Sequence, residues 1–352
     1  MKKIISIDFN SLDYMGGTST FNKNLSEIFN KNISFITYYK SINNPAENEL
    51  NLKIKKNIFY KLINFISSYH LSSFLIRTKI PKETDVLIIN SPSFLRTRLP
   101  GKKKYLILHQ DIDIMMSNRS NFAGSRTYFE KVLKSIDSFI VPSEEDKIKL
   151  INKYNVDSGK LSVIPHLSKL PMLNSSTPKI GTKKLIMVCR LYNKQKRIDL
   201  VLNAMSYLKD WQLTIVGDGP DSQYLKNIKE KNKLDNVSFY GPSNNISELL
   251  DQSSIHIMSS DYEGFGLTNI EAISRGLPII IRDTFPAAKT IINNSGILLN
   301  KTWNKDEFIE ALEKIYNNYN YYSQNALVNA QKYSLEQVKL AWAQVLDQYY
   351  KK

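Results

Sequence analysis

Short β-branched and apolar runs alternate along this chain with longer segments of helical spacing, and this alternation limits the fold more than any other feature. It is typical of a parallel sheet covered by helices, because consecutive parallel strands need a crossover connection between them. The alternation pauses after 160–165 and starts again at 184–190, across a segment at 167–184 rich in Ser, Pro, Gly and Lys. The sequence therefore predicts an α/β fold of two units in series.

The predicted elements divide between these two units. First-unit strands are predicted at 4–9, 33–39, 85–90, 104–110, 138–143 and 160–165. Second-unit strands are predicted at 184–190, 211–217, 237–241, 254–260, 277–283 and 296–300, with helices at 198–208, at 268–276 and from Lys305 onward. A last helix opens at Ser334, which forms a capping-box arrangement with Gln337. We expect one domain over 1–167, completed by the C-terminal helix 334–352, and a second over 181–333.

Composition excludes several classes of protein. Of the 352 residues, 42% are hydrophobic and 23% are charged, which excludes a disordered chain, a collagen and a coiled coil. A single cysteine, Cys189, excludes a disulfide framework and a thiolate metal site. No apolar run reaches the roughly 18–20 residues that span a bilayer, and Asp8 interrupts the first run too early for a signal peptide. We expect a cytoplasmic protein.

Positive charge is concentrated in the first half of the chain. Residues 1–180 carry 27 Lys and Arg against 15 Asp and Glu, whereas residues 181–352 carry 21 against 18, within a net charge of +15. A basic half points to an anionic partner, such as nucleic acid, phospholipid headgroups or a phosphorylated substrate. Biased codon usage explains the same composition, so charge alone does not predict nucleic-acid binding.

The segment at 261–283 carries the most specific signal. Glu263 and Glu271 flank a Gly-rich turn between a predicted strand and a predicted helix. Glycines let a backbone approach a ligand closely, and the free N–H groups of a helix start favour a phosphate. Two carboxylates on either side of such a turn are placed to hold hydroxyl groups, for example those of a sugar and a ribose. The turn consists of Gly264, Phe265, Gly266, Leu267 and Thr268.

Two further segments support a site for a phosphorylated ligand. Arg190 ends a predicted strand and Lys196 follows just before a helix, so two cations stand at the carboxyl end of that strand. Charge-assisted donors of this kind suit a diphosphate, although a solvated basic loop is the alternative. The tight turn at 216–220, which contains Gly217, is a weaker signal because Asp-Gly is common in turns.

Together these motifs resemble family 4 of the retaining glycosyltransferases, whose fold is GT-B. The resemblance spans nearly the whole chain and is strongest at the spacing of Glu263 and Glu271. The other marks are Gly16, Gly17, His109, 141–150, 163–165, Arg190, Lys196, 216–220, Gly241 and 276–278. Two segments depart from the family pattern, at 166–169 and at 284–296, so hinge details and donor selectivity do not transfer.

The resemblance implies two Rossmann-like domains that face each other across a cleft, with the C-terminal helix crossing back to the first. The second domain would hold the donor nucleotide, with Glu271 on the ribose hydroxyls and Glu263 on the donor sugar. Arg190 and Lys196 would bind the diphosphate, helped by the turn, and Gly16 and Gly17 would approach it from the first domain. His109 would lie near the donor sugar and acceptor.

The resemblance also implies an activity. Such enzymes move a hexosyl or N-acetylhexosaminyl group from a nucleotide-sugar, by default a UDP-sugar, to a glycan or lipid-linked acceptor in the synthesis of surface polysaccharides or glycoconjugates. We expect retention of configuration by a front-face mechanism without a metal or other cofactor, in which Glu263, His109, Arg190 and Lys196 are the catalytic residues. In that mechanism the protein mainly positions groups and stabilises charge on the leaving diphosphate.

Other interpretations remain open at this point. Asp111 and Asp113 match an acid-x-acid metal motif that is common by chance. The stretch 53–77 forms, at helical spacing, an apolar face with a lysine flank, which suits either an anionic membrane surface or a core helix. Rival functions are a GT-B sugar-nucleotide epimerase, a phosphorylase and a non-catalytic partner subunit. A dinucleotide oxidoreductase is disfavoured, because the chain lacks a clean G-x-G-x-x-G turn.

Overall fold

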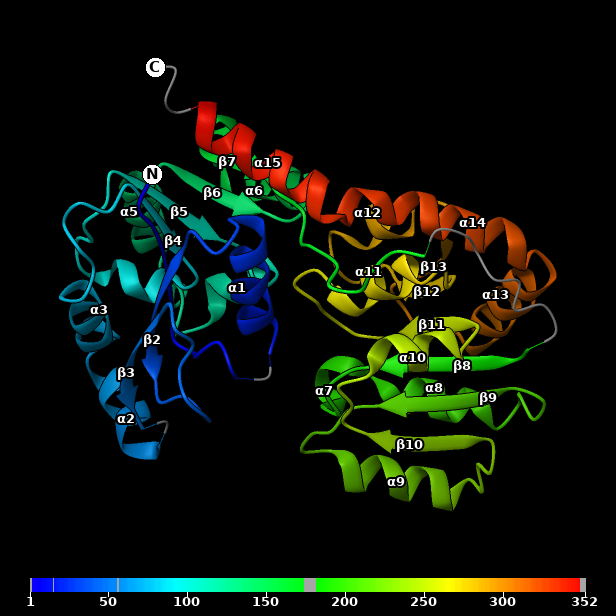
Figure 1. Cartoon of the computed structure of the whole chain (residues 1–352). Coiled ribbons are helices and arrows are strands. Elements are labelled where there is room, and N and C mark those ends of the chain that lie inside the picture. The colour runs from blue at the N-terminus through cyan, green and yellow to red at the C-terminus, as the bar shows by residue number, and fades with distance from the viewer. Residues whose placement is uncertain (1, 15, 56, 174–181, 349–352) are drawn as a thin grey trace. The chain divides into compact units, whose positions relative to one another are not determined.

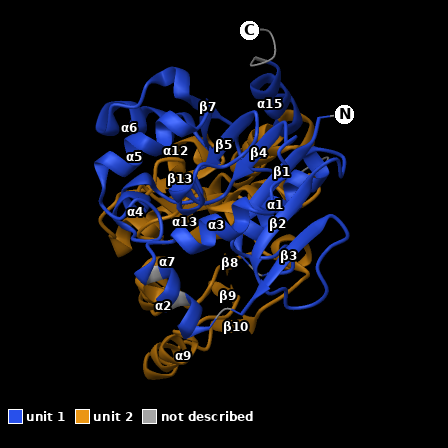
Figure 2. Cartoon of the chain, turned by 90° about the vertical axis from the view of Figure 1, so that its left-hand side faces the viewer, with its two compact units in different colours: residues 1–167, 338–352 blue, residues 168–337 orange. Residues whose placement is uncertain are grey.

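The computed structural model describes residues 2–14, 16–55, 57–173 and 182–348 (Figure 1). The chain forms two compact units, one of Met1–Leu167 with Val338–Lys352 and the other of Ser168–Gln337 (Figure 2). Each unit is built on its own parallel sheet, as the alternating sequence pattern predicts. The loop over 174–181, in the predicted linker, lies outside the described residues.

The first unit contains a seven-stranded parallel sheet in the order β3-β2-β1-β4-β5-β6-β7. Its strands are β1 (Ile4–Asp8), β2 (Ser34–Tyr39), β3 (Glu49–Ile54), β4 (Val86–Ile89), β5 (Lys103–Ile107), β6 (Ser138–Val141) and β7 (Leu161–Val163). Its α-helices are α1 (Gly17–Ile28), α2 (Ile58–Ile66), α3 (His70–Arg77), α4 (Ile112–Ser117), α5 (Arg126–Ser135) and α6 (Glu144–Tyr154). The central strands β1, β4 and β6 are buried on both faces, which is why they read as continuous apolar runs.

The second unit contains a six-stranded parallel sheet in the order β10-β9-β8-β11-β12-β13. Its strands are β8 (Lys184–Val188), β9 (Gln212–Val216), β10 (Val237–Gly241), β11 (Ile255–Met258), β12 (Ile279–Arg282) and β13 (Gly296–Leu299). Its helices are α7 (Asn193–Lys196), α8 (Ile198–Met205), α9 (Ser222–Lys231), α10 (Ile246–Asp251), α11 (Leu267–Ser274), α12 (Ala288–Ile292), α13 (Lys305–Asn317) and α14 (Tyr319–Ala330). In both sheets the strand order reverses once, between β1 and β4 and between β8 and β11.

The last helix, α15 (Leu335–Gln348), returns to the first unit as predicted. Val338 and Trp342 are each 1% exposed and pack in the same core cluster as β-strand and α1 residues of that unit. The resulting apolar burial holds the end of the chain to the first unit. None of the helices in the described parts of the chain combines the length and apolar character that crossing a bilayer requires.

The second unit begins earlier and ends later than the expected range of 181–333. The second unit begins at Ser168, whose backbone N–H donates to the carbonyl of Tyr333, and Leu173 N–H donates to the carbonyl of Ser274. Residues 168–173 therefore belong to the second unit, although their composition resembles a linker. At the other end, the boundary lies after Gln337 instead of before Ser334.

Strand β3 is absent from the sequence prediction because its pattern is inverted. Glu49 and Asn51 point inward, and both interact with the buried Thr37 hydroxyl of β2, whereas Leu50 is half exposed. Hydrogen bonds satisfy these inward polar side chains, which an apolar-pattern search for strands does not detect.

The stretch 53–77 is not one helix, contrary to one reading of its spacing. Lys53 and Ile54 end β3, and the remainder forms α2 and α3. Ser68 and Tyr69 separate these helices with positive φ angles of 46° and 65°, which the right-handed helical conformation does not allow. The alternative of a core helix is also wrong for α2, because most of its described apolar side chains are exposed.

Candidate functional site

The candidate donor site lies in the second unit, where the strand order reverses. The chain leaves the neighbouring strands β8 and β11 in opposite lateral directions. Open α/β sheets bind ligands outside the carboxyl ends of strands at such a reversal. Arg190 and Lys196 follow β8, and Glu263 follows β11. Residues 67 positions apart in sequence are thereby brought into contact.

Lys196 and Glu263 form a buried ion pair. The Lys196 Nζ atom lies 2.5 Å from Glu263 Oε1, and the side chains are only 15% and 8% exposed. Ser260 Oγ donates a second hydrogen bond of 2.6 Å to the same carboxylate oxygen. Buried charges need a partner to offset the loss of hydration, so each of these groups fixes the position of the other. The sequence identified both residues but did not predict that they pair.

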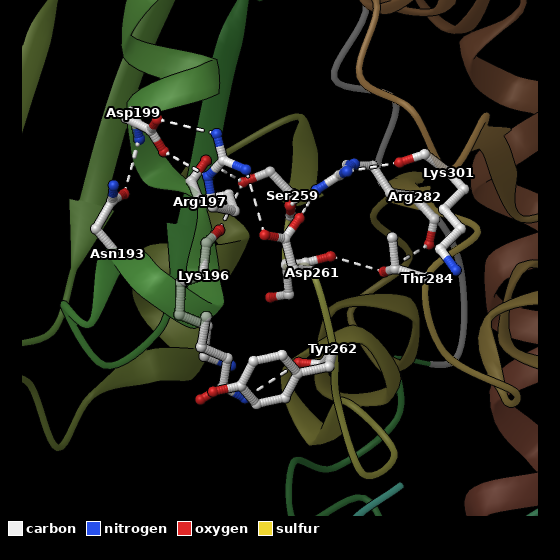
Figure 3. A network of polar contacts seen from close by, with 12 residues as sticks. Asn193, Lys196, Arg197, Asp199, Ser259, Asp261, Tyr262, Arg282, Thr284 and Lys301 are labelled. Carbon is white, nitrogen blue, oxygen red and sulfur yellow. Dashed lines mark hydrogen bonds and ion pairs between the residues drawn. The ribbon is translucent and has the colours of Figure 1, made fainter. Parts of the chain in front are cut away.

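A second layer of ion pairs holds the loop that carries Glu263 (Figure 3). Asp261 accepts from Arg282 of β12 at 2.7 Å and from Arg197, next to Lys196, at 3.2 Å. Arg282 is 5% exposed and also donates to the carbonyls of Ser259 and Lys301. One carboxylate thus joins the Lys196 turn, the Glu263 loop and strand β12.

Sequence reasoning missed Asp261, Arg197 and Arg282. A signal was available for Arg282, because a charged residue at the end of the apolar run 277–283 must be compensated when it is buried. Arg197 gave no such signal, since it reads as one more residue of a basic loop. It adopts a left-handed conformation, with φ 47° and ψ 44°, and Asp199 binds its guanidinium through two atoms.

The Gly-rich turn ends in a helix start that suits a phosphate. Gly266 has φ 83°, and a Cβ there would lie 2.7 Å from Asn269 Nδ2, so this position requires glycine. Helix α11 then begins at Leu267, and the N–H groups of Leu267 and Thr268 have no acceptor within the helix. Thr268 Oγ1 is enclosed and has no hydrogen-bond partner among the described residues, which leaves a donor available for a ligand oxygen.

Packing explains why position 265 is a phenylalanine, and backbone conformation explains why position 217 is a glycine. Phe265 is 3% exposed and packs edge-on against Tyr333, so it anchors the turn to the core. Gly217 has φ 134°, and a Cβ there would lie 1.9 Å from the Cys189 carbonyl oxygen. The close approach of the 216–220 turn to the chain after β8 explains that glycine. The structure puts Gly264 in the same turn as Phe265, half buried.

Glu271 lies one turn inside α11, and its environment differs from that of Glu263. Burial raises the pKa of its carboxyl to about 7, against a smaller opposing effect of Lys169. A carboxyl poised near neutrality becomes fully ionised when a ligand donates hydrogen bonds to it. Arg190, in contrast, is exposed, and its guanidinium makes no hydrogen bond or ion pair with the residues that the structure describes. It is therefore available to an anion.

The first unit gathers His109, Gly16 and Gly17 around α1. Gly17 is the first residue of α1, and a Cβ there would meet nothing within 4 Å, so open space surrounds this position. Phe21 of α1 contacts the His109 ring edge-on at 4.9 Å between centroids. His109 Nε2 lies 2.7 Å from Asn90 Oδ1. Burial, with a smaller effect of His166, lowers the pKa of His109 to about 3, so its ring is neutral.

Sequence reasoning did not predict the pairing of His109 with His166. The two rings lie nearly parallel, 13° apart, with centroids separated by 6.3 Å, and Phe21 contacts both. His166 is itself buried.

Asp111 and Asp113 have amino groups as partners. Lys149 Nζ lies 2.7 Å from Asp111 and 3.1 Å from Asp113, and Lys153 Nζ lies 2.8 Å from Asp113. The Asp111 side chain also accepts from the N–H of Asp113 as the N-cap of α4. These contacts favour the chance explanation of the acid-x-acid match.

Comparison with known proteins supports a glycosyltransferase. Residues 173–332 match the family model described as "Glycosyl transferases group 1". The chain is 30% identical over 172 residues to the "UDP-N-acetylglucosamine--peptide N-acetylglucosaminyltransferase GtfA subunit" of Streptococcus agalactiae, covering 46% of this chain and 33% of that protein. It is 23% identical to the "Amylovoran biosynthesis glycosyltransferase AmsD" of Erwinia amylovora, covering 98% and 99% of the two chains. The match thus spans a third of one relative and nearly all of the other.

Solved structures show the fold. The structure of S. aureus TarM "in complex with Fondaparinux, alpha-GlcNAc-glycerol and UDP" has a TM-score of 0.76 at 15% identity, covering 98% of this chain and 99% of that one. The GT-B class, with two parallel-sheet α/β domains, is therefore confirmed. The family model and the relatives show similarity to glycosyltransferases, and the assignment to family 4 stays a prediction.

The buried ion pair predicts a non-additive effect on stability. Glu263→Gln leaves an unpaired buried ammonium and Lys196→Met an unpaired buried carboxylate, so each should lower the free energy of unfolding by about 3 kcal/mol. The double variant removes both charges and should lie within about 1 kcal/mol of the wild type. Urea-induced unfolding measures all four proteins. A double variant whose loss equals the sum of the single losses would contradict the pairing.

Proposed function

We propose that this chain is a retaining glycosyltransferase. It moves a hexosyl or N-acetylhexosaminyl group from a UDP-sugar to a glycan or lipid-linked acceptor during synthesis of a surface polysaccharide or glycoconjugate. The observation that carries this proposal is the convergence of Arg190, Lys196, Glu263 and the start of α11 at the reversal point of the second sheet. The names of the group 1 relatives support the reaction class, and the UDP in the TarM structure supports the nucleotide.

The proposed mechanism uses the site's fixed charges. Arg190 and Lys196, with the N–H groups of Leu267 and Thr268, would stabilise negative charge on the leaving diphosphate. Glu263, which pairs with Lys196 in the free protein, would accept from hydroxyls of the donor sugar. The departing phosphate would help deprotonate the acceptor hydroxyl on the same face of the sugar, which retains configuration. Two cations and a helix start supply the charge that a divalent metal supplies elsewhere, so we propose that no metal is needed.

The first test is nucleotide release from a panel of UDP-, GDP- and ADP-sugars, with and without EDTA. We expect slow release of UDP from one UDP-sugar, unchanged by EDTA, because slow hydrolysis of the donor does not need the acceptor. The matched control is the variant with Lys196→Met and Glu263→Gln together, which should fold but release nothing.

The other outcomes of this panel overturn parts of the proposal. Release that EDTA abolishes would overturn metal independence. Conversion of the sugar within the nucleotide-sugar would instead identify an epimerase. No nucleotide release from any member of the panel, together with no nucleotide binding, would identify a non-catalytic partner subunit.

Glu271 predicts how donor binding depends on pH. Ribose hydroxyls would donate to the ionised carboxylate, whereas the free protein keeps the Glu271 pKa near 7. UDP should therefore bind more tightly as pH rises towards 7, and the gain should level off above it. The Kd of Glu271→Gln divided by that of the wild type should rise from pH 5.5 to 7.5, and this ratio cancels the titration of UDP itself. A ratio that is independent of pH would contradict a role for this carboxyl.

We further propose that the first unit binds an anionic membrane surface through α2 and α3. Five apolar side chains of these helices are between 51% and 83% exposed: Ile58, Phe59, Leu62, Ile66 and Phe74. Residues 50–82 contain seven Lys and Arg and no Asp or Glu. An apolar patch within a uniformly basic segment suits an anionic bilayer surface, where apolar side chains enter the headgroup region and lysines attract the lipid charge. This surface would bring a cytoplasmic enzyme to a lipid-linked acceptor.

Vesicle binding tests this surface. Replacing Ile58, Phe59 and Leu62 with Ser together should weaken binding to phosphatidylglycerol-containing vesicles at least tenfold, because each side chain loses roughly 1–2 kcal/mol of apolar burial. Vesicles of phosphatidylcholine alone should bind the wild type weakly. The matched control replaces Tyr224, Tyr240 and Val328 of the second unit, which are between 53% and 64% exposed, with Ser. Equal effects of the two triple variants in vesicle co-sedimentation would refute the assignment.

A further inference from the structure

We propose that Asn90 is a positioning residue that determines which ring nitrogen of His109 carries its proton, through a buried chain of hydrogen bonds beginning at Asp8. The consequence is that His109 presents Nδ1 as a hydrogen-bond acceptor for a sugar hydroxyl. The tautomer follows from the contacts themselves, whereas the part played by the sugar hydroxyl rests on the proposed function.

These hydrogen-bonded residues lie at the carboxyl ends of neighbouring strands of the first sheet. Asp8 ends β1, Asn90 follows β4 and His109 follows β5, and these three strands are neighbours in the sheet. Asn22, on α1, contacts both Asp8 and Asn90. Asp8, Asn22 and Asn90 are buried, with exposures of 4%, 0% and 7%. His109 is only half buried, so its ring is the one member of this chain with substantial access to a ligand.

The direction of each hydrogen bond follows from chemistry. Asn22 Nδ2 donates to the Asp8 carboxylate at 2.8 Å, since a carboxylate accepts, and this orients the Asn22 amide. Asn22 Oδ1 therefore faces the other way, and it accepts from Ser6 Oγ at 2.8 Å and from Asn90 Nδ2 at 3.2 Å. Asn90 Nδ2 also donates to the backbone carbonyl of Ile7 at 3.0 Å, which can only accept.

These contacts leave one arrangement for His109. With Asn90 Nδ2 directed at Ile7 and Asn22, Asn90 Oδ1 faces His109 Nε2 at 2.7 Å and must accept from it. Nε2 therefore carries the proton. Because the ring is neutral, with its pKa lowered to about 3 by burial and by His166, it has only that one proton. Nδ1 is left with a lone pair.

Hydrogen bonds determine the tautomer of the His109 ring, and packing determines its plane. The edge-on contact of Phe21 and the near-parallel His166 ring restrict rotation of His109. An acceptor atom held in a fixed direction discriminates strongly among ligands, because a bound sugar without the matching hydroxyl would cover the acceptor and leave it unpaired. His109 thus recognises a hydroxyl group and, being neutral, does not serve as a charge.

Nitrogen NMR of protein labelled with ¹⁵N-histidine tests the tautomer directly and requires no activity. In the wild type, the His109 signals should show a protonated Nε2 and an unprotonated Nδ1, assigned by their loss in His109→Gln. In Asn90→Leu the two signals should move towards each other as both tautomers become populated. The matched control is Asn24→Leu, which removes another buried amide of the same unit that bonds to the Leu167 carbonyl and lies outside this chain.

Kinetics then separates positioning from a merely structural role. Asn90→Leu should lower kcat/KM about tenfold or more in the wild-type background and have little further effect in His109→Gln, whereas Asn24→Leu should have the same effect in both backgrounds. A protonated Nδ1 in the wild type, or a spectrum that Asn90→Leu leaves unchanged, would overturn the proposal while leaving the glycosyltransferase proposal intact. Equal effects of Asn90→Leu in both backgrounds would remove the link between Asn90 and the reaction. If Asn90→Leu does not fold, the wild-type spectrum alone still decides the tautomer.

Discussion

All parallel strands of a sheet end at the same edge, and this constraint determines where both units can assemble polar side chains. At the reversal of strand order the connections leave to opposite sides, so the strand ends there remain uncovered by crossover loops. In the second unit, Lys196 follows β8 and Glu263 follows β11, on either side of the reversal. In the first unit, Asp8 ends β1 and Asn90 follows β4, again on either side of it. The same topology thus gives both units a polar cluster at the corresponding place.

The two clusters solve the problem of burying polar groups in different ways. The second unit buries opposite charges against each other, and Asp261 extends this to Arg197 and Arg282. The first unit buries a carboxylate among amides, and its series of hydrogen bonds ends at a neutral imidazole. Paired charges suit a ligand that is itself an anion, because the positive partner can interact with both. A neutral, directed acceptor suits a hydroxyl group, which carries no charge but has a defined geometry.

The predictability of each feature depended on whether its cause was local in sequence. Buried parallel strands are continuous apolar runs, so nearly all were predicted, whereas β3 was not, because Glu49 and Asn51 face inward. The Gly-rich turn with Glu263 and Glu271 could be found because its parts are adjacent in the chain. The pairing of Asp261 with Arg282 and that of His109 with His166 could not be found in the sequence. Each pair depends on neighbouring strands and crossover packing that bring distant residues together. A site whose residues are close together in the sequence can be predicted from it, whereas contacts that only the fold creates cannot.

The Lys196–Glu263 pair connects stability with the proposed catalysis. Without a ligand, each charge offsets the other's loss of hydration, so the site keeps a buried lysine without a bound anion. A diphosphate would attract the same ammonium group, and the carboxylate would then be freer to accept from sugar hydroxyls. The two ligand interactions therefore favour each other, since the phosphate draws the lysine from the carboxylate that the sugar requires. Because Asp261, Arg197 and Arg282 hold the backbone on both sides of the pair, this exchange needs little movement, which is the preorganisation that electrostatic catalysis depends on.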